Sequence, residues 1–356
     1  MAENLRSSSW LLRLIISVVI SGAYVNVWDC TFAQITPDRT LPNNSTFEKN
    51  TGIIEGGTQA GSNLYHSFEQ FSVPTDTQAY FNNALDIQNI ISRVTGGSAS
   101  VIDGLIKANG SANLFFINPN GIIFGSKAEL NIKGSLIATT ANSLKFADGA
   151  LFSAFPSQST PLLTVSVPIG LQFQGTAGSI RVEGSDLRVE PSKTLALVGG
   201  DVTLQGGKLE ALKQANSTVP RVRIELGSVA GVGEVSLNQK DNNWVLGYAS
   251  VNNFGDIRLQ DKAFVDVRDI GGDVQIQSRN LVVTGGSLIS AAKIEVNAAD
   301  SVELSDARNS RSGLFTRTEG AEGTGNAGNL TINTKRLSVQ DGTQVSTTST
   351  RISHKI

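Results

Sequence analysis

The chain has 356 residues, 40% of them apolar, and a formal net charge of −2. This apolar content is that of a folded protein and argues against a disordered polar chain. Lys and Arg number 29 against 31 Asp and Glu, with no basic cluster, which argues against nucleic acid as a partner.

Residues 1–33 have the three parts of an export signal. Arg6 and Arg13 precede the apolar run 14–20, and Thr31-Phe32-Ala33 provides a small-x-small cleavage site. A membrane anchor is the alternative, but an anchor needs about 20 largely uncharged apolar residues. We therefore predict a signal peptide over 1–33, cleaved between Ala33 and Gln34, and export to the periplasm. Cys30 next to Trp28 and Asp29 is a poor lipidation site.

Cys30 is the single cysteine, so the mature chain would contain none. Two explanations remain open at this point. A chain of this length buries enough core without disulfides, or it must stay free of closed loops in order to pass a second membrane unfolded.

The block 34–160 contains a strong turn signal. Asn118-Pro119-Asn120-Gly121 lies between two apolar segments, 113–117 and 122–124. Asn at the first position of a turn hydrogen-bonds forward, Pro presets φ at the second, and Gly closes the turn. We predict a turn between two strands here, which could belong to a hairpin or to a solenoid corner, with Phe115, Phe116 and Phe124 nearby.

The segment 161–348 repeats one phrase, Gly followed by a polar residue and two β-formers separated by a polar residue. Full copies begin at Gly178, Gly200, Gly255, Gly272 and Gly328, and partial copies begin at Gly233 and Ala292. Residues 272–290 and 328–346 align without a gap. The period-two alternation predicts strands with one buried face, and a unit of about 20 residues is buried only by stacking on its neighbours. The prediction is an all-β, right-handed parallel β-helix. A β-sandwich, the alternative, gives no reason for the repeat.

Residues 349–356 follow the last repeat as a short tail, which we interpret as the end of a truncated or frame-disrupted piece of a longer protein.

The sequence suggests no catalytic residue, no metal site and no cofactor. The strongest exception is a group of acidic residues with two arginines among them, as polysaccharide-cleaving β-helices require: Asp256, Asp261, Asp266, Asp269, Arg258 and Arg268. Strand alternation would place several of these residues on the solvent face, so ordinary surface charge is the favoured explanation. A pectate-lyase-type enzyme is therefore the alternative function.

An ordered series of motifs accompanies the Asn118–Gly121 turn: 61–73, 89–97, 100–110 and 134–141. The series resembles the N-terminal secretion domain of filamentous haemagglutinin-type exoproteins, in the variant common in cyanobacteria. A second family motif, Asn-Pro-Asn-Leu, has its nearest match at Phe81-Asn82-Asn83-Ala84, which lacks the proline and makes Asn82 and Asn83 poor binding candidates.

The resemblance implies that 34–160 is a two-partner-secretion domain, capping the β-helix and recognised by the periplasmic modules of an outer-membrane transporter. It implies an adhesin-like protein that is secreted or retained at the outer cell surface, where a host, neighbouring-cell or matrix surface would be its target. Asn118, Pro119, Asn120 and Gly121 match the family motif. Their role is left open between a folding turn and a transporter contact.

Overall fold

The computed structural model describes residues 34–156, 163–212, 222–268, 271–306, 312–320 and 328–351, all within the compact unit Ala33–Ile356. The predicted signal peptide, residues 1–33, lies outside the described residues, and Gln34, the residue after the predicted cleavage site, begins the first strand. The described residues are strands and turns, and they contain no helix long and apolar enough to span a membrane.

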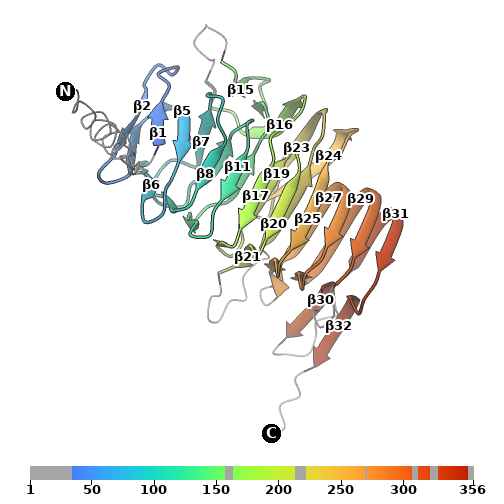
Figure 1. The fold of residues 1–356 in the computed structure, drawn as a ribbon. Helices are drawn as coiled ribbons and strands as arrows, with labels where there is room; N and C mark the ends of the chain where they lie inside the picture. Colours follow the sequence, from blue (N-terminus) through green and yellow to red (C-terminus); the bar gives the residue numbers. More distant parts are fainter. Residues whose placement is uncertain are drawn as a thin grey trace, which may run out of the picture. The chain divides into compact units, whose positions relative to one another are not determined.

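Successive turns of the chain stack into a coil with three faces (Figure 1). The first face consists of parallel strands and of the N-terminal halves of three long strands: β5 (Asn63–Ser72), β7 (Asn89–Val94), β10 (Asn113–Ile117), β13 (Leu136–Thr139), β19 (Thr194–Gly199), β22 (Arg223–Ser228), and the halves of β27 (Asp273–Val283), β29 (Lys293–Leu304) and β31 (Leu330–Val339).

The second face continues each coil after a corner. It contains β8 (Ser100–Ile102), β11 (Ile122–Phe124), β17 (Ile180–Glu183), β20 (Val202–Gln205), β25 (Asp256–Gln260) and the C-terminal halves of β27, β29 and β31. The first two faces, with β1 (Gln34–Pro37) and β4 (Thr58–Ala60) at the N-terminal end, form one 16-stranded sheet, called sheet A, because the long strands bend from one face to the other.

The third face is divided between two sheets. Sheet B contains β3 (Ile53–Gly56), β6 (Gln78–Phe81), β9 (Leu105–Ala108) and β12 (Glu129–Asn131). Sheet D contains β18 (Asp186–Val189), β21 (Lys208–Ala211), β26 (Phe264–Asp266), β28 (Leu288–Ala291), β30 (Gly313–Gly320) and β32 (Gln344–Arg351). The parallel ladders on all three faces confirm the predicted β-helix and contradict a sandwich.

The N-terminal end of the coil is capped. Strand β1 (Gln34–Pro37) pairs antiparallel with β5, and β2 (Ser45–Glu48) pairs antiparallel with β3; β4 (Thr58–Ala60) forms a hairpin with β5. Antiparallel strands thus cover the first edges of sheets A and B, where unpaired backbone groups would otherwise invite aggregation.

A separate antiparallel sheet, sheet C, lies outside the coil. Its strands are β14 (Ser143–Phe146), β15 (Leu151–Ser153), β16 (Pro168–Gln174), β23 (Val232–Lys240) and β24 (Asn243–Val251). Two segments supply it, one between β13 and β17 and the other between β22 and β25. The partial repeat at Gly233 is therefore not a coil: it lies in β23, which pairs antiparallel with β16 and β24. The β-strand pattern was correct there, but alternation alone does not distinguish a coil strand from a hairpin strand.

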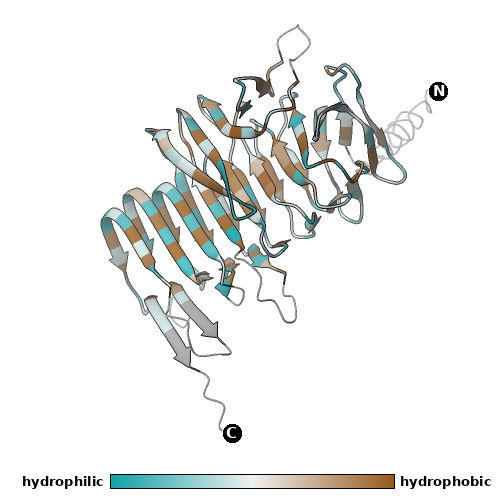
Figure 2. Ribbon diagram, turned by 180° about the vertical axis from the view of Figure 1, so that it is seen from behind, coloured by the Kyte–Doolittle hydropathy of each residue, from teal (hydrophilic) through white to brown (hydrophobic). Residues whose placement is uncertain are grey.

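Two apolar cores result. The first runs inside the coil from Ile35 to Leu314, and the second fills the space between the outer side of the first face and sheet C. Side chains that point out of the coil, such as Phe115, Ile137 and Val198, belong to the second core. In the later coils the outward side chains are polar, and Figure 2 shows teal and brown alternating along those strands.

The repeat phrase occupies two different corners of the coil. The copies at Gly178, Gly200 and Gly255 lead into strands of the second face, whereas those at Gly272 and Gly328 and the partial copy at Ala292 lead into the first face. Residues 272–290 and 328–346, which align without a gap, form equivalent strand-turn-strand units in β27–β28 and β31–β32.

Candidate functional site

The predicted turn joins β10 to β11, at the corner between the first and second faces. The amide N of Gly121 donates to the carbonyl O of Asn118 at 3.2 Å, which closes a β-turn. Asn118 Oδ1 accepts a hydrogen bond from the amide N of Asn120 at 3.0 Å. Gly121 has φ +127°, and a Cβ there would lie 3.2 Å from the carbonyl O of Ser179. Glycine is therefore required at this position.

The turn also connects neighbouring coils. Asn118 Nδ2 donates to the carbonyl O of Ser98 at 3.0 Å and to Ser100 Oγ at 2.9 Å, in the coil before. The carbonyl O of Pro119 accepts from the amide N of Gly178 at 2.9 Å, in the coil after. Every polar group of the Asn118 side chain is thus used inside the stack.

Accessibility separates the four residues of the turn. Asn118 is fully buried, Pro119 and Gly121 are buried, and Asn120 is the exposed member. Asn120 Nδ2 donates to the carbonyl O of Gly96 at 2.6 Å, so this side chain too is partly held by the coil. A partner touching the folded turn would meet Asn120 first.

The phenylalanines beside the turn connect it to both cores. Phe115 belongs to the outer core, where its ring packs edge-on against Trp244 with centroids 5.3 Å apart. Phe116 and Phe124 point into the coil, and Phe116 lies 4.9 Å from Phe71 between ring centroids. The turn is therefore anchored by aromatic packing on two sides.

A buried arginine connects the N-terminal cap to the coil and to sheet C. Arg93, on β7, is fully buried. Its guanidinium donates to Ser67 Oγ at 2.7 Å, to Thr40 Oγ1 at 2.7 Å and to the carbonyl O of Ser153 at 2.5 Å. It also lies 4.2 Å from the ring centroid of Phe152. One side chain thus binds segments up to 60 residues away along the chain.

Asp38 supplies the opposite charge near Arg93. Burial raises the pKa of Asp38, but hydrogen bonds from Ser67, Thr95 and Thr40 outweigh burial and leave the pKa below its usual value. Burial lowers the pKa of Arg93 to about 10, against the opposing effect of the Asp38 charge. Both groups therefore carry their charges at neutral pH.

Three asparagines form a ladder across the first coils. Asn63, Asn89 and Asn113 occupy paired positions at the start of β5, β7 and β10. Asn89 Nδ2 donates to Asn63 Oδ1 at 2.9 Å, and Asn113 Nδ2 donates to Asn89 Oδ1 at 3.0 Å. Both Asn63 and Asn89 are buried. Each side-chain amide hydrogen-bonds to the amide in the next coil, and these bonds hold the three coils in register.

Sequence reasoning missed both Arg93 and the ladder. A signal for the ladder was present, because Asn followed by two apolar or aromatic residues recurs at 63, 89 and 113, with intervals of 26 and 24 residues. No local pattern marks Arg93, whose partners come from distant segments.

The two asparagines of the incomplete family motif differ in position. Asn83 is buried and exchanges hydrogen bonds with Asn109 in the next coil. Asn82 is exposed, and its Nδ2 donates to Glu55 Oε1 at 2.8 Å. Asn83 thus connects two coils, and Asn82 contacts the neighbouring strand.

The acidic residues proposed for catalysis do not converge. Asp256, at the start of β25, is bound by Arg279 and Arg258, and these contacts outweigh burial and lower the pKa of its carboxyl group. Asp261 lies in the next turn, where Oδ2 accepts from Gln205 Nε2 at 3.1 Å, and Asp266 lies on the third face, paired with Arg268 at 3.2 Å. Asp269 is outside the described residues. Among the described residues, no group of three His, Cys, Asp or Glu is arranged for a metal ion.

Comparison with known proteins agrees with this architecture. The family model of the TPS secretion domain matches residues 33–280. A heme/hemopexin-binding protein of Haemophilus influenzae is 31% identical over 135 residues, which cover 36% of this chain and 13% of that protein. A protein of the same name from H. influenzae strain Rd is 51% identical over 49 residues, covering 14% of this chain and 5% of that protein. The chain therefore matches only a small part of the length of these relatives.

A solved structure supports the fold. The crystal structure of a filamentous hemagglutinin secretion domain superposes with a TM-score of 0.50 at 16% identity, covering 88% of this chain and 99% of that one. The matched family model spans the cap, the buried arginine, the asparagine ladder, the Asn118–Gly121 turn and all of sheet C. By this match, which extends over more than half of its length, the chain belongs to the TPS secretion-domain family, the secretion domains of two-partner-secreted exoproteins.

Proposed function

We propose that this chain is an adhesin-like exoprotein, exported through the periplasm and passed across the outer membrane by a two-partner-secretion transporter. Residues 1–33 serve as the signal peptide for export to the periplasm and are removed between Ala33 and Gln34. Residues 34–160 serve as the signal that the outer-membrane transporter recognises. The coils of 161–348 then form the beginning of a surface-exposed stalk. The family match over residues 33–280 is the observation that carries this proposal.

The N-terminal region suits a second role, as folding nucleus of the β-helix. Its cap, buried Arg93 and asparagine ladder stabilise the first coils through specific polar contacts. Later coils need only the preceding coil as a template. The absence of cysteine beyond Cys30 fits passage as an unfolded chain, because a disulfide closed in the periplasm would leave a loop to be threaded.

For the Asn118–Gly121 turn we propose a folding role in preference to a transporter contact, because the Asn118 side chain is used entirely within the stack. The test compares Asn118→Ala with Asn120→Ala in cells that also produce the cognate transporter. Removing the buried amide of Asn118 leaves the carbonyl O of Ser98 and the hydroxyl of Ser100 without their hydrogen-bond donor. This loss should lower the free energy of unfolding by about 1–3 kcal/mol.

We expect Asn118→Ala to lower both the urea midpoint of the purified protein and the secreted amount, and Asn120→Ala to lower neither by much. Secretion lost with Asn120→Ala at unchanged stability would instead assign the turn to the transporter. Protein that reaches the medium equally well without the transporter would overturn the secretion route itself.

A surface on a host, a neighbouring cell or the extracellular matrix is the target that we propose for the secreted protein. The second candidate, an enzyme of the pectate-lyase type, is disfavoured because Asp256, Asp261 and Asp266 lie on different parts of the coil. An activity screen on acidic polysaccharides decides between the two. Turnover that is abolished by Asp256→Ala or Asp266→Ala would establish the enzyme.

A further inference from the structure

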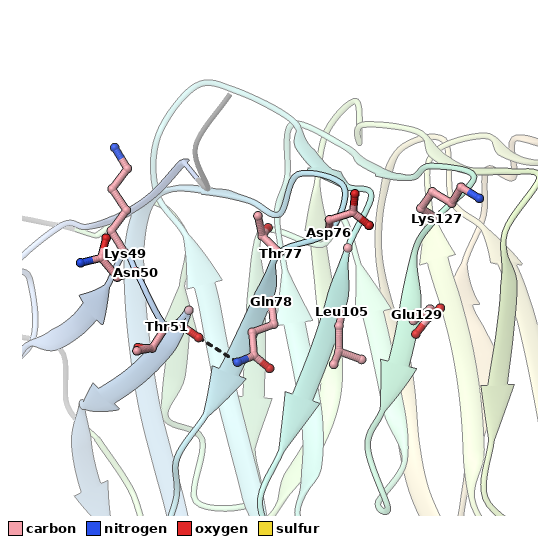
Figure 3. Close-up of a pocket in the computed structure, with 11 residues that line it drawn as sticks. Lys49, Asn50, Thr51, Asp76, Thr77, Gln78, Leu105, Lys127 and Glu129 are labelled. Atoms are coloured by element: carbon pink, nitrogen blue, oxygen red, sulfur yellow. Dashed lines mark hydrogen bonds between the residues drawn. The ribbon is translucent and has the colours of Figure 1, made fainter. Parts of the chain in front are cut away.

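A polar groove crosses the third face of the first coils. Its lining residues lie where the chain enters successive strands of sheet B, and its volume is about 670 Å³. Figure 3 shows Thr51, in the turn before β3, followed by Gln78, Leu105 and Glu129 at the starts of β6, β9 and β12. A second hollow of about 510 Å³ shares Lys127 and Glu129 with the first and extends to Asp186 and Arg188. The lining is thus elongated along the coil axis.

The direction of the groove restricts what it can hold. Gln78, Leu105 and Glu129 are register partners on adjacent parallel strands, so the groove runs across the strands. Strands β6 and β9 each have a neighbour on both sides, which occupies their ladder hydrogen bonds. An extended peptide recognises a sheet by pairing with a free edge. Across β6 and β9 the groove offers no such edge, and side chains must make the contacts there; β12 is the last strand of sheet B, so its outer edge alone remains open to pairing.

The side chains of the groove combine hydroxyl, amide, carboxylate and ammonium groups. Asp76, Lys127 and Glu129 are exposed, and Gln78 and Thr77 are half-buried. Gln78 Nε2 donates to the carbonyl O of Thr51 at 2.8 Å, which orients the amide and leaves Oε1 as an acceptor (Figure 3). These groups recur at the inter-strand spacing of about 4.8 Å. They can therefore donate and accept hydrogen bonds along a chain of hydroxyl groups.

The charges in the groove are balanced. The first hollow is lined by two positive side chains, Lys49 and Lys127, and by two negative ones, Asp76 and Glu129. In the second hollow, Arg188 forms an ion pair with Asp186 at 2.6 Å. A polyanion such as a sulfated or uronic-acid polysaccharide would meet carboxylates as well as lysines. The lining therefore favours an uncharged ligand with many hydroxyl groups.

We propose that this groove binds an uncharged oligosaccharide, which lies along the coil axis across β6, β9 and β12. Gln78, Lys127 and Glu129 form the hydrogen bonds to successive sugar rings, and the half-buried Leu105 contacts an apolar ring face. The site belongs to the folded coil and acts after export, so it is independent of how the protein crosses the outer membrane. It would give the secretion domain a binding activity of its own.

The test measures the dissociation constant by isothermal titration calorimetry and the chemical-shift changes by NMR. It uses the purified full chain with maltotetraose, cellotetraose and chitotetraose as probes. We expect at least one probe to bind, and the double variant Gln78→Ala, Glu129→Ala to weaken that binding about tenfold or more, as the loss of one or two hydrogen bonds predicts. Glu303→Ala is the matched control, since Glu303 is exposed on β29 away from the groove. It should bind as the original protein does.

Lys127→Ala provides a second variant if the double variant has a lowered urea midpoint, because no described contact of its side chain supports the fold. It should weaken binding while leaving the midpoint unchanged. The proposal is overturned if none of the three probes binds at millimolar concentration, or if the groove variants bind as tightly as the control. Tighter binding of heparin or of an extended peptide through the same residues would also overturn it.

Discussion

The β-helix has covered coils, whose first face lies under sheet C, and bare coils, whose first face does not. The two sets of coils are stabilised in different ways. From β5 to β22 the outer side of the first face is covered by sheet C, and the coils are held by Arg93, by the asparagine ladder and by two apolar cores. In β27, β29 and β31 the outer side is polar, and order comes from repetition of the apolar positions. The Arg93 contacts and the asparagine ladder belong to the start of the stack, where no preceding coil provides a template.

The difference is visible at the last coil. Leu330, Ile332 and Leu337 pair with Ile294, Val296 and Val302, which are fully buried. In β31, however, Leu337 and Val339 are 48% and 43% exposed. The sequence pattern is unchanged between the two strands. Burial of these positions therefore depends on a following coil, whereas the first coils are closed by their own cap.

The largest effect should come from the buried charge of the covered region. Arg93→Ala removes a fully buried guanidinium with its three hydrogen bonds, and it leaves the half-buried Asp38 without the positive charge near it. We expect the free energy of unfolding to fall by about 3–5 kcal/mol, measured by urea unfolding. Arg181→Ala is the control, because the Arg181–Glu183 ion pair is 45% and 39% exposed, and should cost at most about 1 kcal/mol. Similar losses in the two variants would show that the buried guanidinium contributes no more than an exposed ion pair.

The boundary between the two regions should respond to pH. Glu225, on β22 beneath the hairpin β23–β24, is fully buried, and burial raises its pKa to about 7 despite the ion pair with Arg223. Its Oε2 and the hydroxyl of Tyr248 have no hydrogen-bond partner among the described residues, and Arg223, Tyr248 and Glu295 are the titratable groups that influence it. The folded protein therefore keeps this proton where the unfolded chain loses it.

The unfolded glutamate, with a pKa of 4.5, releases its proton first as the pH rises. The free energy of unfolding therefore falls between about pH 4.5 and pH 7, and the loss persists above pH 7. Glu225→Gln removes this contribution, which is at most about 3 kcal/mol. We expect the variant to gain stability relative to the original protein between pH 5 and pH 8. Burial lowers the pKa of His66 to about 3, so His66 makes the free energy of unfolding rise with pH, in the opposite direction to Glu225. The measurement that tests Glu225 is therefore the difference in the free energy of unfolding between the variant and the original protein, taken at pH 5 and at pH 8. A difference that is the same at both pH values would contradict the assignment.

The smallest expected effect compares two amide contacts. Asn89→Ala interrupts the buried ladder on both sides and should cost about 1–3 kcal/mol in the urea assay. Asn297→Ala removes an exposed contact, in which Asn333 Nδ2 donates to Asn297 Oδ1 at 2.7 Å, and should cost less than about 1 kcal/mol. Equal costs would show that amide stacking contributes alike in the covered and the bare coils.

The sequence by itself determined the fold class and the candidate turn. Alternation of apolar and polar residues is a local property of a strand, and a phrase of about 20 residues repeats because each coil meets the same environment. The turn at Asn118–Gly121 was equally predictable, since its residue types act within four positions. The hand of the coil, the domain boundaries and the signal cleavage site stay predictions.

Tertiary structure alone decided sheet C, the contacts of Arg93 and the groove. Phe115 and Val198 point out of the coil and look in sequence like residues of any strand, and only the arrival of a second sheet buries them. Gly233 lies in a hairpin strand although it begins a copy of the coil phrase. Arg93 finds its partners 26 to 60 residues away. Local periodicity specifies which side of a strand is apolar, but the segment that covers the other side is chosen by long-range packing.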